Sequence, residues 1–477
     1  MGFKLFALFE RNYSTKQFLS IVLNKRKLYF FRDYMNYKLI SLFMTILISI
    51  GTISSVASVE FNNSVIYTDK FDILEIQSDD LTNDGTNEII AYTAGKKLLC
   101  LDDKGNLKWD LESNNSFSIV KVMDVYGEPE KEIIVGTENR VISKKEIYNA
   151  LLYLLDSEGK EITVIPIVGS VLDFDIGDVD SNGTYETIIG ADDGNVYLFN
   201  QELNFLWDYK TKGYNFRTLI TDLNQDGKNE ILVVSFDNTF LLDGQGKLTN
   251  SYTTKNILRA LFLDKFHNMI HVSRWYRDES QDWKGTIVYS LNRNLAPMWE
   301  FKTETDSVAS ALFDINNDGK EEIILGGSKG EIIILDSKGT FIKRFDLPDR
   351  IFKIGFIKFE NQPSLVLGCK DNNLYILNTN SGITEYILST GGWVETFFVK
   401  DLNNDGLEDI LVGSDDNKIY LLTQKKVVIP SNNDTNKTET KPIEEPKSET
   451  KNTPFEEVGI IGGTIFGAIY LAFRKRK

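Results

Sequence analysis

The most constraining feature of this chain is a short acidic loop that recurs between runs of β-branched and aromatic residues. In D-I-N-N-D-G-K-E-E, from Asp314 to Glu322, oxygen-bearing side chains occupy alternate positions and Gly319 permits a sharp turn. Alternating oxygens of this kind suit a hard cation such as Ca²⁺. We number the loop positions one to nine. Four further copies begin at Asp80, Asp178, Asp222 and Asp401.

Three degraded copies complete a repeat of eight units, and they lie around Asp124, Asp264 and Lys358. Successive starts are 42 to 54 residues apart. Each unit has four runs typical of short strands, as in Val171–Asp178, Glu186–Asp192, Asn195–Asn200 and Phe205–Thr211. Four strands repeated at this period predict an all-β fold, an eight-bladed β-propeller of four-stranded blades over residues 58–424.

The two ends of the repeat predict how the ring closes. The eighth unit stops after its third strand, whereas Ser64–Lys70 precedes the first unit without a partner of its own. This segment is similar to the fourth strands of other units. We therefore expect the N-terminal strand to pair with the last blade as its fourth strand. This pairing removes the open edge of the N-terminal strand and that of the last blade.

The loop and the strand after it resemble the FG-GAP repeats of integrin α-subunit propellers. The third and fourth strands, as in Gly190–Gly213, are similar to the tryptophan-bearing blades of quinoprotein-like (PQQ-like) propellers. The resemblance covers about Ser64 to Gln424 and concerns the fold more than the function, because such repeats serve adhesins, assembly factors and enzymes. The eight units differ from the integrin pattern of seven.

The resemblance implies calcium at five loops, about five ions in all. Side chains at positions one, three, five and nine and the backbone at position seven would be the ligands. These residues are Asp80, Thr82, Asp84, Thr86 and Glu88; Asp178, Asp180, Asn182, Thr184 and Glu186; Asp222, Asn224, Asp226, Lys228 and Glu230; Asp314, Asn316, Asp318, Lys320 and Glu322; and Asp401, Asn403, Asp405, Leu407 and Asp409. The alternative is that the loops are Asx turns without an ion.

Charge supports the calcium interpretation. The chain has 53 basic and 69 acidic residues, a net charge of −16, which argues against nucleic acid as a partner. Each intact loop places three carboxylates at ligand positions, and these would repel one another without a cation. The two cysteines, Cys100 and Cys369, are too few for a disulfide framework.

A ligand-binding surface is expected on the face opposite the acidic loops. Units two and five carry insertions between their second and third strands, at Glu138–Ala150 and Arg274–Gly285. Exposed tryptophan, tyrosine and arginine are frequent binding hot spots. The alternative is that these aromatic residues only pack the insertions against the ring. The candidate ligand-binding residues are Arg274, Trp275, Tyr276, Arg277, Trp283 and Trp393.

The N-terminal residues 1–57 read as a basic region followed by a secretory signal. Leu39–Ile53 is apolar and is followed by small residues that end near Ala57. An uncleaved membrane helix is the alternative. The basic stretch before this segment is too long for the charged end of an ordinary signal. Met35 is therefore an alternative to Met1 as the start of translation. Whether the apolar segment is cleaved or stays as a membrane helix, the repeat that follows it is expected outside the cell.

The C-terminal residues predict a membrane anchor. Residues 425–457 are rich in proline and polar residues and predict a disordered stalk. Val458–Phe473 is uncharged and predicts one transmembrane helix, followed by the basic residues 474–477 on the cytoplasmic side. Gly459, Gly463 and Gly467 would lie on one helix face and could pair two chains as a dimer. A cleaved sorting signal is the alternative.

Together these features predict a single-pass membrane protein with an extracellular calcium-binding propeller. We expect it to act as an adhesion or binding module for a protein or glycan. No catalytic motif is visible, so an enzyme is not expected. The alternatives are a saccharide-active, lyase-like propeller enzyme and a scaffold for assembling envelope proteins.

Overall fold

The computed structural model describes residues 60–143, 146–211, 213–254, 258–264, 269–274, 284–359 and 362–425. The expected signal segment, residues 426–457 of the stalk, the helix at Val458–Phe473, the basic tail and the proposed glycine dimer face lie outside these residues. Within the described ranges, no helix is long and apolar enough to cross a membrane.

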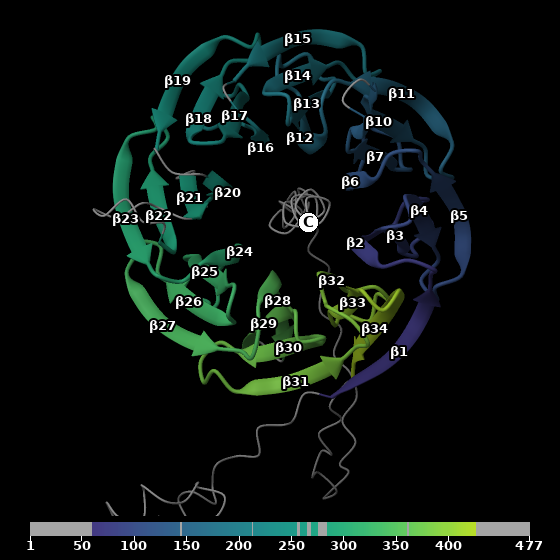
Figure 1. Ribbon diagram of the computed structural model, residues 1–477, viewed down its shortest axis with the longest axis vertical. Helices are drawn as coiled ribbons and strands as arrows, with labels where there is room; N and C mark the ends of the chain where they lie inside the picture. The colour runs from purple at the N-terminus through teal and green to yellow at the C-terminus, as the bar shows by residue number, and fades with distance from the viewer. Residues whose placement is uncertain are drawn as a thin grey trace, which may run out of the picture. The chain divides into compact units, whose positions relative to one another are not determined.

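The described residues form eight four-stranded antiparallel sheets arranged as the blades of a ring (Figure 1). The repeat therefore folds as the eight-bladed propeller that its period predicts. The strands of blades 1 to 4, from the centre of the ring outward, are β2 (Ile73–Asp79), β3 (Glu88–Thr93), β4 (Lys97–Leu101) and β5 (Leu107–Glu112); β6 (Phe117–Met123), β7 (Glu132–Thr137), β10 (Ala150–Leu155) and β11 (Glu161–Ile167); β12 (Val171–Gly177), β13 (Glu186–Ala191), β14 (Asn195–Phe199) and β15 (Phe205–Lys210); and β16 (Asn215–Thr221), β17 (Glu230–Ser235), β18 (Asn238–Leu242) and β19 (Leu248–Thr253).

Blades 5 to 8 repeat the same arrangement. Their strands are β20 (Leu258–Leu263), β21 (Met269–Arg274), β22 (Thr286–Leu291) and β23 (Pro297–Thr303); β24 (Ser307–Phe313), β25 (Glu322–Gly327), β26 (Glu331–Leu335) and β27 (Phe341–Asp346); β28 (Ile351–Phe359), β29 (Gln362–Cys369), β30 (Asn373–Asn378) and β31 (Thr384–Ser389); and β32 (Thr396–Lys400), β33 (Asp409–Ser414), β34 (Lys418–Gln424) and β1 (Phe61–Thr68). A separate two-stranded sheet, β8 (Arg140–Ser143) with β9 (Glu146–Tyr148), is inserted in blade 2.

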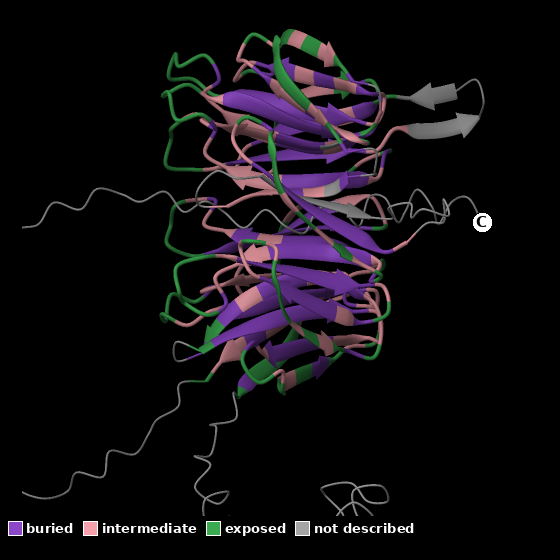
Figure 2. Ribbon diagram, turned by 90° about the vertical axis from the view of Figure 1, so that its left-hand side faces the viewer, coloured by how far each residue is buried: buried purple, intermediate pink, exposed green. Residues whose placement is uncertain are grey.

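The core lies between the blades. Second strands such as β13 and β25 are buried along their whole length, whereas the outermost strands β5, β15 and β27 expose alternate residues. Apolar side chains on both faces of a blade pack against both neighbours, and each of the eight blade-to-blade boundaries contains one hydrophobic cluster. Figure 2 shows the buried strands inside the ring and exposed loop residues along one side.

Tryptophans of the fourth strands fasten neighbouring blades. Trp109 of blade 1 lies on Gly159 in blade 2, where a Cβ atom would come within 2.4 Å of the indole ring. Its Nε1 donates a hydrogen bond to the Ser157 carbonyl at 3.2 Å. Gly159 also has a φ of +77°, so glycine meets both a conformational and a spatial need. Trp207 on Gly246 repeats the contact between blades 3 and 4.

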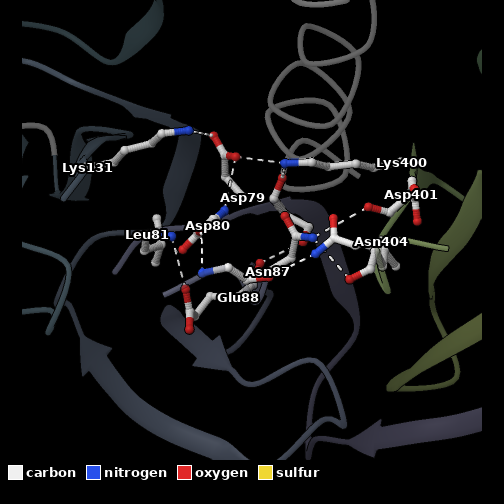
Figure 3. A network of polar contacts seen from close by, with 12 residues as sticks. Asp79, Asp80, Leu81, Asn87, Glu88, Lys131, Lys400, Asp401 and Asn404 are labelled. Atoms are coloured by element: carbon white, nitrogen blue, oxygen red, sulfur yellow. Dashed lines mark hydrogen bonds and ion pairs between the residues drawn. The ribbon is translucent and has the colours of Figure 1, made fainter. Parts of the chain in front are cut away.

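The N-terminal strand closes the ring, as the sequence predicts. β1 pairs antiparallel with β34, from Phe61 opposite Gln424 to Thr68 opposite Lys418. An ion pair between innermost strands supports the seam between blades 8 and 1, and a second ion pair joins blade 1 to blade 2. Asp79 of blade 1 lies 2.7 Å from both Lys400 of blade 8 and Lys131 of blade 2 (Figure 3).

Candidate functional site

The five intact acidic loops join the first strand to the second strand of blades 1, 3, 4, 6 and 8, and they share one backbone conformation. Position four always has a positive φ, between 53° and 63°. The glycine at position six has a φ between 79° and 88°, with nothing near its missing Cβ atom. This glycine is therefore required for the left-handed turn and not for space. The position-four and position-six residues are Asn83 and Gly85, Ser181 and Gly183, Gln225 and Gly227, Asn317 and Gly319, and Asn404 and Gly406.

The aspartate at position one organises each loop. Its two carboxylate oxygens accept hydrogen bonds from the backbone amides of positions five and six, as Asp314 does from Asp318 at 3.1 Å and Gly319 at 2.9 Å. The same pair of bonds recurs at Asp80, Asp178, Asp222 and Asp401. The side chain at position five accepts a bond from the position-seven amide in every loop. These bonds hold the position-one and position-five oxygens in fixed places.

The side chain at position nine is buried in all five intact loops although it is ionisable. Glu88, Glu186, Glu230, Glu322 and Asp409 begin the second strands, and each is at most 9% exposed. Each accepts a hydrogen bond from the amide at position two, for example Ile315 to Glu322 at 3.1 Å.

Burial of these carboxylates has an electrostatic consequence. Burial, followed by repulsion from Asp318 and Asp314, raises the pKa of Glu322 to about 7. The pKa of Asp409 rises to about 6 for the same reasons, with Asp405 and Asp401 as the repelling neighbours. A divalent cation next to these groups would offset both causes.

The donor set of the loops fits a hard divalent cation. In blade 3, ligand oxygens of Asp178, Asp180 and Glu186 all lie within 4.8 Å of one another. In blade 4 the Asn224 amide nitrogen lies between two carboxylates, 2.6 Å from Glu230 and 3.0 Å from Asp226. This amide must turn over to offer its oxygen as a ligand. Carboxylate and amide oxygens of this kind are the usual ligands of Ca²⁺.

Blade 1 differs because a protein cation already touches its loop. The Lys108 Nζ atom lies 2.7 Å from Glu88 Oε1. The sequence motif does not reveal this contact, because Lys108 is distant from the loop along the chain. The signal that could have found it is the basic residue directly before Trp109, at a place where blade 3 has Leu206.

The degraded loop of blade 2 keeps only part of this arrangement. Glu132 accepts the Val125 amide at 2.8 Å, and Asp124 accepts the Gly127 amide. Tyr126 and Glu128 stand at positions three and five, and Pro129 at position six. The bond of position nine therefore survives in blade 2, whereas Asp124 bonds the amide of position four and not those of positions five and six.

The opposite face carries the predicted insertions. β8 and β9 connect β7 to β10, and because the strands of a blade are antiparallel, this connection emerges at the end away from the acidic loops. Arg274 is the last residue of β21, whereas Trp275, Tyr276, Arg277 and Trp283 lie outside the described residues.

Trp393 belongs to a partly buried aromatic cluster on this same face. Its ring stacks on Phe352 with centroids 5.8 Å apart, and Lys370 Nζ lies 5.0 Å from the Trp393 centroid. Arg350 lies over Phe352 at 5.2 Å. These contacts cover part of the Trp393 ring, and its role in ligand binding stays a prediction.

Comparisons with known proteins identify the fold. The family model of the λ-carrageenase β-propeller domain matches residues 53–168 and 306–391. No curated protein sequence is significantly similar to the chain. Similar solved structures include Sqt1 from Saccharomyces cerevisiae, with 13% identity over 77% of this chain and 98% of that chain and a TM-score of 0.57. BamB from Moraxella catarrhalis has 14% identity, covers 76% of this chain and 98% of its own, and has a TM-score of 0.52. The designed protein Ika8 has 12% identity over 75% and 98%, with a TM-score of 0.56.

At these identities the solved structures are similar in fold alone. The chain is a β-propeller, and one family model relates parts of it to the propeller of a λ-carrageenase. The more specific resemblance to FG-GAP and quinoprotein-like repeats stays a prediction.

Proposed function

We propose that this chain is a calcium-stabilised propeller that binds an extracellular protein or glycan through the face opposite its acidic loops. The observation that supports this best is the separation of the two features along every blade. The loops with cation-type donors lie at one end of the strands, and the β8–β9 insertion lies at the other. On this proposal, calcium stabilises the ring and does not contact the ligand.

Calcium binding is tested by thermal unfolding of the full-length chain with millimolar Ca²⁺ and with a chelator. A ligand that binds only the folded state raises the melting temperature. We expect a higher melting temperature with calcium and a stoichiometry near five by calorimetric titration. Asp314→Asn with Asp318→Asn should remove one ion and no more. Equal melting temperatures in the two conditions would contradict the calcium part of the proposal.

Ligand binding is tested by probing glycan arrays and panels of purified extracellular proteins with the chain. A variant in which residues 139–149 are replaced by a short glycine-serine turn removes the β8–β9 insertion. A variant that lacks Arg274–Lys284 removes the other one. We expect loss of binding in at least one of these variants and an unchanged melting temperature in the first. Ligand binding that survives both deletions would place the binding surface elsewhere.

A saccharide-active enzyme is the second candidate, because the λ-carrageenase propeller model matches two parts of the chain. Incubation with λ-carrageenan followed by size-exclusion chromatography distinguishes the two. We expect no shortening of the polysaccharide if the chain is a binding module. The apolar segment Val458–Phe473 further leads us to propose that the propeller is anchored at the outer surface of a membrane, which protease accessibility on intact cells would test.

A further inference from the structure

The intact acidic loops are not distributed evenly around the ring. Blades 8 and 1 are neighbours across the seam, and blades 3 and 4 are also neighbours, so four of the five intact loops form two adjacent pairs. Blade 6 stands between the degraded loops of blades 5 and 7. Within each pair, a hydrogen bond from an asparagine side chain crosses from one loop to the other.

In the pair of blades 3 and 4, the link joins a residue beside one proposed ligand to the backbone of another. The Asn229 Nδ2 atom donates to the backbone carbonyl of Asp178 at 2.7 Å. Asn229 stands at position eight, directly before the position-nine ligand Glu230, whereas Asp178 is position one of the neighbouring loop. Ordering Glu230 therefore also orders the backbone that carries Asp178.

The pair of blades 8 and 1 has two such links, which run in both directions (Figure 3). Asn87, at position eight of blade 1, donates to the Leu402 carbonyl at 3.0 Å. Asn404, at position four of blade 8, donates to the Gly85 carbonyl at 2.8 Å. Asn87 is only 5% exposed, so water does not compete freely for its bond.

Position eight follows a pattern that matches this pairing. It is asparagine only in blades 1 and 4, the two intact loops that follow another intact loop around the ring. Where the preceding loop is degraded, position eight is Tyr185, Glu321 or Glu408. Glu408 accepts a bond from the backbone amide of Lys358 in blade 7 instead. The asparagine thus occurs where there is a neighbouring site to join.

We propose that calcium binds cooperatively within the pairs of blades 8 with 1 and 3 with 4, and independently in blade 6. This inference rests on the proposed calcium function. An ion in one loop fixes its ligands, and the cross-loop bond passes part of that order to the neighbour, so the second ion has less conformational entropy to overcome. Because coupling between two binding sites is reciprocal, silencing either loop of a pair must weaken the other equally.

The test is a calorimetric titration of the full-length chain with Ca²⁺, using variants that silence one loop each. Asp178→Asn with Asp180→Asn silences blade 3, and we expect one remaining site to lose about fivefold or more in affinity, the lower end of common coupling. Asp314→Asn with Asp318→Asn silences blade 6 and removes the same charge. This control should leave the four remaining affinities unchanged.

A double-mutant cycle then assigns the coupling to Asn229. Asn229→Ala should keep five ions bound but weaken the blade 4 site about as much as silencing blade 3 does. In the background with blade 3 silenced, Asn229→Ala should have no further effect. Tyr185→Ala, at the same loop position in blade 3, is the matched control and should change nothing. If the Asn229 variant does not fold, Asn87→Ala combined with Asn404→Gly repeats the test in the other pair, because both links must be removed there.

The outcomes separate the two proposals. A wild-type chain that binds no calcium contradicts the proposed function and, with it, the pairing. A chain that binds five ions while the silenced blade 3 loop leaves all other affinities unchanged contradicts only the pairing. A full effect of Asn229→Ala in the silenced background would also overturn it, because the asparagine would then act on its own loop alone.

Discussion

Lys108 shows how one side chain changes a repeated loop. Its ammonium group contacts Glu88, the position-nine carboxylate of blade 1. The position-nine carboxylates of the other four intact loops have no lysine partner among the described contacts. On the proposed function, a calcium ion in blade 1 would have to compete with this lysine for the carboxylate. The five loops are therefore not equivalent, even though their backbones are the same.

Replacing Lys108 by methionine should raise the calcium affinity of the blade 1 site, because the bound cation no longer displaces an ammonium group. Without calcium the same variant should melt at a lower temperature than the wild type, since Glu88 is then buried without that partner. Calorimetric titration and thermal unfolding in chelator measure the two effects. Lys104→Met, on the exposed turn before β5, is the control. Unchanged affinity in the Lys108 variant would show that the contact does not compete.

The two cysteines are buried and free, and both are expected to be unreactive in the folded chain. Burial raises the pKa of Cys100 from 9.0 to about 12, and the pKa of Cys369 is raised as well. At pH 8 iodoacetamide should therefore modify neither thiol in the native protein but both in denaturant, as mass spectrometry would show.

The raised pKa of Cys100 also makes the stability of the folded chain depend on pH. Between pH 9 and about 12 the unfolded thiol of Cys100 ionises while the folded thiol stays protonated. Its contribution to stability is thus complete below pH 9 and is lost as the pH rises above it. Rapid native labelling of Cys100 would contradict this burial.

The fourth strands do more than cover the rim, because the tryptophans of blades 1, 3 and 5 pack on a glycine of the following blade. Trp207→Ala removes the packing on Gly246 and the bond to the Gly244 carbonyl. Since the indole is only partly buried, we expect a loss of about 2 kcal/mol in the free energy of unfolding, below that of a fully buried tryptophan. Trp207→Phe keeps a ring on the glycine and should lose less. Denaturant unfolding with an unchanged midpoint for the alanine variant would show that the contact is not stabilising.

Strand order was predictable from the sequence because two periodicities coincide. Alternation along each strand and the interval between acidic loops both point to four strands per unit, as in Val171–Lys210 of blade 3. The loop ligands could be predicted because neighbouring residues make the loop. Contacts between residues far apart along the chain could not be predicted from the loop motif. Lys108 reaches Glu88 within blade 1, and Asn229 reaches Asp178 between blades 4 and 3.

Ring closure makes the stability of all eight blades depend on one strand. Deleting residues 61–68 removes β1, leaves β34 with an open edge and takes Phe61 from the cluster between blades 7 and 8. We expect a large fall in the melting temperature and a less cooperative transition. The variant in which a short glycine-serine turn replaces residues 139–149 shortens an insertion outside the eight sheets instead, and this control should melt like the wild type. A similar melting temperature for both deletions would contradict closure by β1.

The same closure sets an order in time. β1 is the first strand of the ring to be synthesised, yet its partner β34 is completed only when Gln424 has been added. While the seven intervening blades are synthesised, the edge of β1 stays exposed because β34 has not yet been made. Unpaired strand edges of this kind favour aggregation. The pairing that completes the fold is also the one of greatest sequence separation, so closure is expected to be a late and slow folding step. We therefore expect correct folding of the chain to depend on protection of unpaired β1 until the last blade has been made.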